Sequence, residues 1–130
     1  SGNPTYIRTS TSFHQDPLGA ASAHGINGML YDAFPPLVYD SWVTVGLTST
    51  ADPAAGEGEV TLVEGESWVS AFEAGGNIEL SGTYGGGWFS LNGSSNGAAG
   101  DDLRVLIGQF TTDGVFSGQV YVQVFPQRRR

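Results

Sequence analysis

Two amides and two adjacent carboxylates lie close together in the stretch LNGSSNGAAGDDLRVLIGQF, residues 91–110. Side-chain oxygens of Asn and Asp, together with loop carbonyls, are the hard ligands that calcium prefers. The candidate calcium ligands are Asn92, Asn96, Asp101 and Asp102. Their spacing does not match an EF-hand loop, because the glycine and the closing Glu are missing from their places. The alternative is turn chemistry, in which two Asn-Gly steps supply positive φ and the aspartates end the loop. We predict the turn and no cofactor, with calcium as the alternative.

Few side chains are available for catalysis. His14 and His24 share a loop-rich stretch with Asp16 and Ser22. These are the residue types of a Ser-His-Asp triad, but their presence in one stretch does not establish one. No nucleophile motif surrounds the serine, and the chain has no Lys and no Cys. The two adjacent aspartates would point to opposite faces of a strand, which separates them as an acid/base pair. We therefore predict that the protein is not an enzyme.

Aromatic side chains offer a second kind of site. A tryptophan flanked by glycines, Trp88, lies four residues after Tyr84, and their rings could stack on sugar faces. The alternative is that Trp88 belongs to the core with Trp42 and Trp68, which is the commoner place for a tryptophan. The sequence leaves both interpretations open.

The composition excludes several classes of function. The chain has 130 residues and a net charge of −8, and its five basic residues are all Arg, three of them at 128–130. An acidic body of this kind repels phosphate backbones and anionic membranes, so we expect neither nucleic acid nor a membrane as a partner. The apolar runs are far too short to span a bilayer. The absence of Cys excludes disulfides and thiolate metal sites.

Alternating apolar and polar residues between Gly-rich turns predict strands along most of the chain. The predicted strands lie within residues 40–49, 58–65, 68–74, 77–82, 85–93, 103–112 and 115–125. Residues 103–112 are apolar on both faces, as in a central strand. Gly75-Gly76 and Asp113-Gly114 are predicted to be hairpin turns. Short, closely spaced strands predict an all-β fold, an antiparallel β-sandwich of jelly-roll or immunoglobulin-like type, with an open barrel as the alternative.

The first 37 residues differ from the rest. Residues 1–13 form a β-prone arm, 14–37 a loop-rich connector with three prolines, 38–126 the sandwich and 127–130 a basic tail. Fully extended, the arm could reach about 43 Å, far enough to pair with a neighbouring molecule, and the connector would supply slack. The residues expected to make this contact are Thr5, Tyr6, Ile7, Thr9, Thr11 and Phe13. The alternative is that the arm folds back onto its own domain.

Four blocks of sequence carry a resemblance to a known family: NPTYIRTSTSFHQDPLG, YDSWVTVGL, GGGWFSLNGSSNGAAGDDLRVLIGQFTTDG and SGQVYVQVF. The chain resembles an uncharacterised β-rich domain of large secreted proteins of aquatic bacteria. More loosely, it is similar to subunits of extracellular fibrils that assemble by strand donation. The resemblance implies a secreted or cell-surface domain and assigns no catalytic residue.

We therefore expect a structural subunit of an extracellular bacterial fibril or surface layer, with copies of itself as partners. Polymerisation would proceed by addition of the N-terminal arm to a neighbouring subunit. The alternative is a secreted carbohydrate-binding or adhesion module, with glycans as partners.

Overall fold

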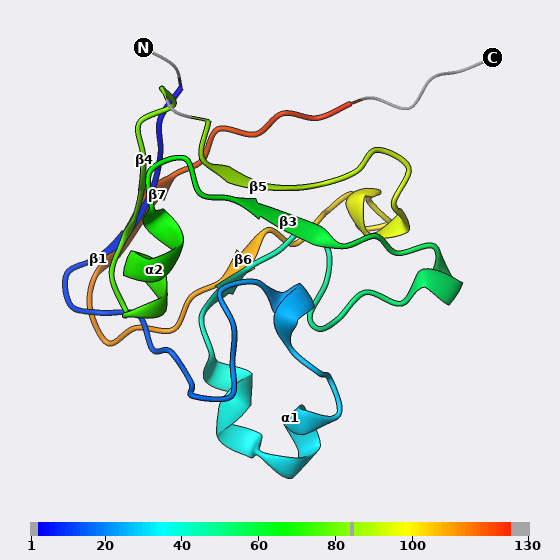
Figure 1. Ribbon diagram of the computed structural model, residues 1–130, viewed down its shortest axis with the longest axis horizontal. Helices are drawn as coiled ribbons and strands as arrows, with labels where there is room; N and C mark the ends of the chain where they lie inside the picture. The colour runs from blue at the N-terminus through cyan, green and yellow to red at the C-terminus, as the bar shows by residue number, and fades with distance from the viewer. Residues whose placement is uncertain (1–2, 84, 126–130) are drawn as a thin grey trace.

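A computed structural model describes residues 3–83 and 85–125 of the chain. Seven short strands carry the fold, and two short α-helices and four 3₁₀ helices connect them (Figure 1). The strands are β1 (Thr5–Thr9), β2 (Trp42–Val43), β3 (Val60–Val63), β4 (Ile78–Leu80), β5 (Gly87–Ser90), β6 (Gly108–Gln109) and β7 (Phe116–Gln119). The α-helices are α1 (Leu30–Ala33) and α2 (Trp68–Glu73), and the 3₁₀ helices are η1 (Ala23–Gly25), η2 (Pro35–Tyr39), η3 (Pro53–Ala55) and η4 (Ser95–Gly97).

The strands form three antiparallel sheets. The largest has the order β4-β1-β7, with β1 in the middle, and β2-β6 and β3-β5 form two-stranded sheets. The prediction of a mainly-β, antiparallel fold is confirmed. Because β1 is the central strand of the largest sheet, the N-terminal arm of the sequence prediction is an integral part of the fold in this single chain.

Two apolar clusters fill the interior. The first lies between the three-stranded sheet and α2, and its buried members are Ile7, Phe13, Ala21, Val43, Trp68, Phe72, Ile78 and Leu80. The second is made largely by the connector, and its buried members are Ala23, Ile26, Leu37 and Trp42. Residues 14–37, the predicted loop-rich connector, hold η1, α1 and part of η2 and bury apolar side chains of their own, so most of this segment is anchored in the body.

The prediction of a strand over residues 68–74 is wrong, because Trp68–Glu73 form α2. Trp68 and Phe72 are four residues apart, so a helix places both rings on one face, and both are buried there. Gly75-Gly76 does not close a hairpin but ends this helix. Gly75 has a φ of +93°, and the N–H of Gly76 donates to Ala71 O at 2.8 Å.

The predicted hairpin at Asp113-Gly114 is also wrong. The strands on either side do not pair with each other, since β6 pairs with β2 and β7 pairs with β1. The turn is held by the N-terminal segment, where the Thr11 hydroxyl donates to Asp113 Oδ1 at 2.7 Å and Val115 N donates to Ser10 Oγ at 2.8 Å. Only Gly108–Gln109 of the expected central strand 103–112 is a strand, and Leu103, Leu106 and Ile107 are exposed.

Candidate assembly site

The residues predicted to form the assembly arm lie in β1 and the segment that follows it. Threonine and isoleucine favour a strand because their branched side chains pack well on a pleated surface. Thr5, Ile7 and Thr9 point into the molecule and are buried, whereas Tyr6 is half-buried and Arg8 is exposed. The alternation is therefore that of a strand with one face on the core.

Both edges of β1 are occupied by distant parts of the same chain. On one side Tyr6 pairs with Glu79 and Ile7 with Ile78 of β4. On the other side Tyr6 pairs with Gln119 of β7, and the register continues to Thr9 opposite Phe116. Each ladder joins segments at least 70 residues apart, so β1 has the position of an inserted strand.

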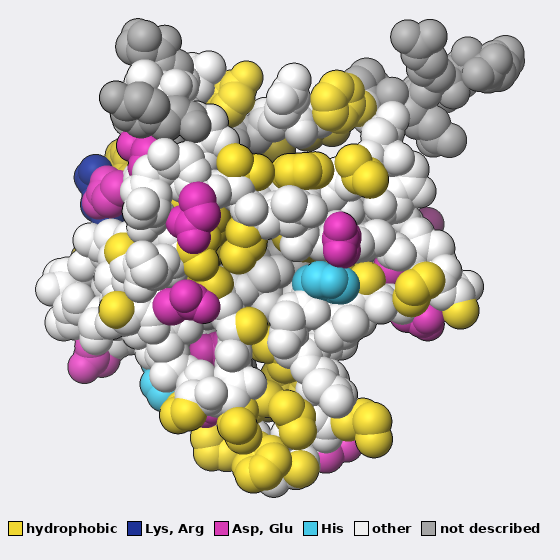
Figure 2. All heavy atoms as spheres, viewed as in Figure 1, with side chains coloured by type: hydrophobic (Ala, Val, Ile, Leu, Met, Phe, Trp, Pro, Cys, Tyr) yellow, Lys and Arg dark blue, Asp and Glu magenta, His cyan; other side chains and the backbone are white. Residues whose placement is uncertain are grey.

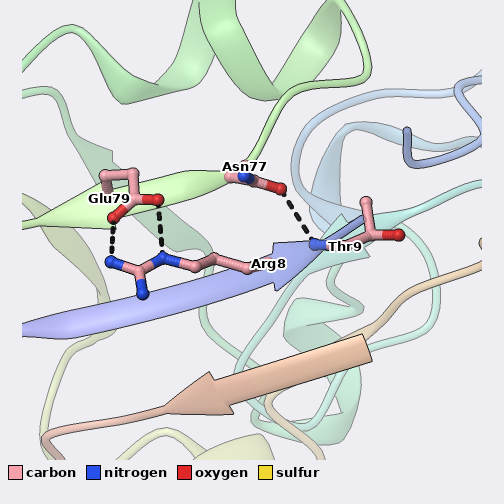
Figure 3. A network of polar contacts seen from close by, with 4 residues as sticks. All are labelled: Arg8, Thr9, Asn77 and Glu79. Carbon is pink, nitrogen blue, oxygen red and sulfur yellow. Dashed lines mark hydrogen bonds and ion pairs between the residues drawn. The ribbon is translucent and has the colours of Figure 1, made fainter. Parts of the chain in front are cut away.

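Polar contacts on the outer face fix the register of β1 against the β4 side (Figure 3). The Arg8 guanidinium makes two 2.8 Å hydrogen bonds to the Glu79 carboxylate and lies 3.9 Å from the centre of the Tyr6 ring. The N–H of Thr9 donates to Asn77 Oδ1 at 2.9 Å. The hydrogen bonds from Arg8 lower the pKa of Glu79. Because this pair is exposed to solvent, it specifies alignment more than it stabilises the fold.

Phe13 is the main apolar anchor of the N-terminal segment. Its side chain is 2% exposed, and its ring centre lies 5.9 Å from that of Phe72, 5.5 Å from that of Phe110 and 6.3 Å from that of Phe116. Its N–H donates to Gly75 O at 2.8 Å. At the end of β1, the hydroxyls of Thr9 and Thr112 lie 2.6 Å apart. The segment is thus anchored by its buried residues Thr5, Ile7, Thr9 and Phe13.

A buried carboxylate holds the link between this segment and the rest of the molecule. Asp40 Oδ1 accepts from the N–H of Asp16 at 2.9 Å, and Oδ2 accepts from the N–H of Ala20 at 3.1 Å. The Asp16–Pro17–Leu18–Gly19 turn is closed by a 2.9 Å hydrogen bond from Gly19 N to Asp16 O, and a Cβ at Gly19 would collide with the carboxylate. Burial raises the pKa of Asp40, and these N–H donors oppose that effect. We call residues 14–20 the hinge.

The candidate calcium ligands differ in their surroundings. Asn96 is buried, and its amide is engaged by the backbone: Oδ1 accepts from Gly58 N at 2.9 Å, and Nδ2 donates to Val45 O at 2.8 Å and to Gly58 O at 3.2 Å. Asp102 Oδ1 accepts from the N–H of Arg104 at 3.1 Å, which is a local turn contact. Asn92 and Asp101 are exposed. Within residues 3–83 and 85–125, no three His, Asp or Glu side chains are grouped so as to hold a metal ion.

The proposed glycan platform can be placed only in part, because Tyr84 lies outside the described residues. The Trp88 ring packs 5.7 Å from the Trp68 ring, and its Nε1 donates to Thr44 O at 2.9 Å. Trp42 and Trp68 are buried. The core interpretation of these tryptophans therefore fits their positions better than the stacking interpretation.

The histidines and their neighbours make structural contacts. Ser22 Oγ accepts from the backbone N–H of His24, and Nδ1 of His24 accepts from the N–H of Ala51 at 3.0 Å. Asp16 Oδ1 accepts from the N–H of Leu18. These contacts do not place Ser22 against an imidazole. The sequence analysis did not single out Asp40, whose only signal was a carboxylate directly before an apolar strand, and it named Asn96 only as a candidate calcium ligand.

Comparisons with protein families, with characterised proteins and with solved structures found no match to this chain. In the part of the chain that the structure describes, no helix is both long and apolar enough to cross a membrane.

Proposed function

We propose that this protein is a structural subunit that polymerises by exchanging its N-terminal strand with a neighbouring copy. The observation that carries the proposal is the position of β1, which lies between β4 and β7 and is covalently connected to neither of them nearby. Every ladder contact of β1 could be made equally well by the β1 of another molecule. The strand that closes the sheet within one chain is then the strand that joins two chains.

The conformation of the hinge determines whether β1 pairs with β4 and β7 of its own chain or with those of a neighbouring copy. Residues 14–20 contribute no strand, and the hinge turn contains a proline and is held by Asp40. Opening this turn would free Thr5–Phe13 without unfolding β2 or the second apolar cluster. Since each molecule would donate at one place and accept at another, the contact is head-to-tail and can continue without limit.

We further propose that the polymer is extracellular, in a fibril or surface layer, and that its subunit is an antiparallel β-sandwich with the β4-β1-β7 sheet as one face. The acidic, Cys-free composition supports a soluble domain that folds without disulfides. The exposed apolar side chains support association with other chains.

A cysteine pair across the β1–β4 ladder tests the exchange directly, because the chain has no cysteine of its own. Tyr6 and Glu79 are register partners on the outer face, at a separation that suits a disulfide. In Tyr6→Cys/Glu79→Cys, oxidation of an exchanged polymer links each subunit to the next. We expect a ladder of covalent multimers on a non-reducing denaturing gel.

The matched control is Thr61→Cys/Phe89→Cys, a register pair between β3 and β5 that no exchange separates. It should give a cross-linked monomer under the same conditions. If assemblies form but the Tyr6–Glu79 variant yields only cross-linked monomer, copies associate without exchanging β1 and the proposal is wrong.

A further inference from the structure

The C-terminal part of the chain carries a strand-like apolar segment that the fold leaves uncovered. All residues from Phe116 to Phe125 are exposed, although valine recurs at every second position from Val120 to Val124. The chain leaves the sheet after β7 and runs along the upper edge of the molecule (Figure 1). Its large exposed apolar side chains are Val115, Phe116, Val120, Tyr121, Val122, Val124 and Phe125. We call residues 115–125 the C-terminal edge.

Only one side of this edge is used within the chain. β7 pairs with β1 on one side, and its other side carries no ladder in the part of the chain described. After β7 the chain continues past the start of β1. Gln119, the last residue of β7, is opposite Tyr6, and the N–H of Tyr121 donates to Thr5 Oγ1 at 2.9 Å. An open apolar edge of this kind is a template for pairing with another strand.

The charge pattern indicates what occupies the edge. The chain has a net charge of −8, yet no residue from Gly114 to Gln127 is charged. Two copies would repel each other over most of their surface, but two C-terminal edges placed side by side would bring no like charges together.

The apolar side chains add to the contact that two such edges can make. In paired antiparallel strands the backbone groups of the edge find hydrogen-bond partners, and side chains directly opposite each other are in contact on both faces of the sheet. Seven of the exposed large apolar side chains lie in residues 115–125.

We propose that the C-terminal edge pairs with the C-terminal edge of a second copy, in antiparallel orientation about a twofold axis. The same surface is used by both molecules, so this contact closes as a dimer. Strand exchange uses the opposite edge of β7 and is head-to-tail, so the two contacts are independent. If both form, the dimer contact joins polymers side by side.

The test uses the oxidised Tyr6→Cys/Glu79→Cys monomer, in which β1 is locked to its own sheet and exchange is barred. We expect this locked protein to dimerise reversibly in sedimentation velocity. Val122→Lys and Val124→Lys should each raise the dimer dissociation constant at least tenfold, because they place like charges in the paired edge. Leu103→Lys, at a leucine that lies elsewhere and is more exposed than either valine, should leave the dissociation constant unchanged.

A scan of single cysteines through residues 117–125, without the lock, gives the register. For twofold antiparallel pairing, disulfide dimers should form most readily at the position nearest the axis and not at positions further along, because equal positions two residues from the axis are about 14 Å apart. A locked protein that stays monomeric at about 100 μM, or a dimer that tolerates both lysines, overturns the proposal. Failure here leaves strand exchange untouched, because the cysteine-ladder experiment reports on the β1–β4 pairing and not on the C-terminal edge.

Discussion

Polar side chains that the sequence suggested for ligands or catalysis serve mainly to hold backbone segments together. Asn96 connects Val45 with Gly58, two loops that no ladder joins. A buried amide that makes three backbone hydrogen bonds is expensive to replace, because its partners would lose their own contacts. Its role also makes Asn96 a poor calcium ligand, since its oxygen is already occupied.

Asp40 has the same kind of role but carries a charge. Its pKa is raised, chiefly by burial, with Asp16 nearby adding to the effect, so the folded state binds the Asp40 proton more tightly than the unfolded state does. The contribution of Asp40 to stability is therefore fully present below its unfolded pKa and is lost as the pH rises through its folded pKa.

This predicts a pH-dependent difference between the wild type and Asp40→Asn, whose side chain does not titrate. The free energy of unfolding of the wild type, minus that of the variant, should increase as the pH falls from neutral toward about 4. Urea unfolding at a series of pH values measures this difference. The lowered pKa of Glu79 acts in the opposite direction, but it is common to both proteins and cancels. A difference that does not vary with pH would contradict the raised pKa.

At the scale of elements, the periodicity of apolar residues located the strands but not their partners. The predicted range 58–65 contains Val60–Val63, and 77–82 contains Ile78–Leu80. Pairing depends on contacts across the chain, which an alternating pattern does not contain. The Asp113-Gly114 turn illustrates this, because the hydroxyls of Ser10 and Thr11 hold it from about 100 residues away.

The helix α2 was missed for a different reason. The β propensity of Trp, Val and Phe outweighed the spacing of Trp68 and Phe72, which was the true signal. The buried residues of the connector were missed because short 3₁₀ and α segments have no periodicity long enough to detect. Asn96 illustrates the same limit, since its position in the sequence did not show that distant backbone groups engage its amide.

The N-terminal strand should depend strongly on one ring. Phe13→Ala removes a buried phenyl group from a cluster with Phe72, Phe110 and Phe116, and we expect a loss of about 3–5 kcal/mol in the free energy of unfolding. Chemical denaturation measures this loss, and Ser12→Ala, at an exposed neighbour, is the control and should change stability by less than about 0.5 kcal/mol. A small effect of Phe13→Ala would mean that the segment after β1 is not packed as described. Because the same contact would be made within one chain or between two, Phe13→Ala should weaken assembly as well as folding.

At the scale of the whole molecule, charge and apolar surface act against each other. Thirteen acidic side chains are spread over a chain whose exposed apolar side chains gather at the C-terminal edge and over α1 and η2, the latter seen at the lower end of the space-filling view (Figure 2). The acidic body opposes the approach of copies, and the uncharged edges permit it only in particular orientations. Assembly should therefore be selective in geometry and sensitive to ionic strength.

We expect assembly to increase with salt. Raising the ionic strength from 0.01 M to 0.15 M shortens the Debye length from about 30 Å to about 8 Å, which screens the repulsion between bodies of net charge −8 but leaves the apolar contacts intact. Light scattering at constant protein concentration measures this increase.

Calcium chloride and magnesium chloride at equal ionic strength serve as the control, since general screening predicts the same response to both. A response to calcium alone would instead support the cation site at residues 92–102. Assembly that weakens with salt would show that ion pairs between copies, such as those of the arginines at 128–130 with acidic side chains, outweigh the apolar contacts.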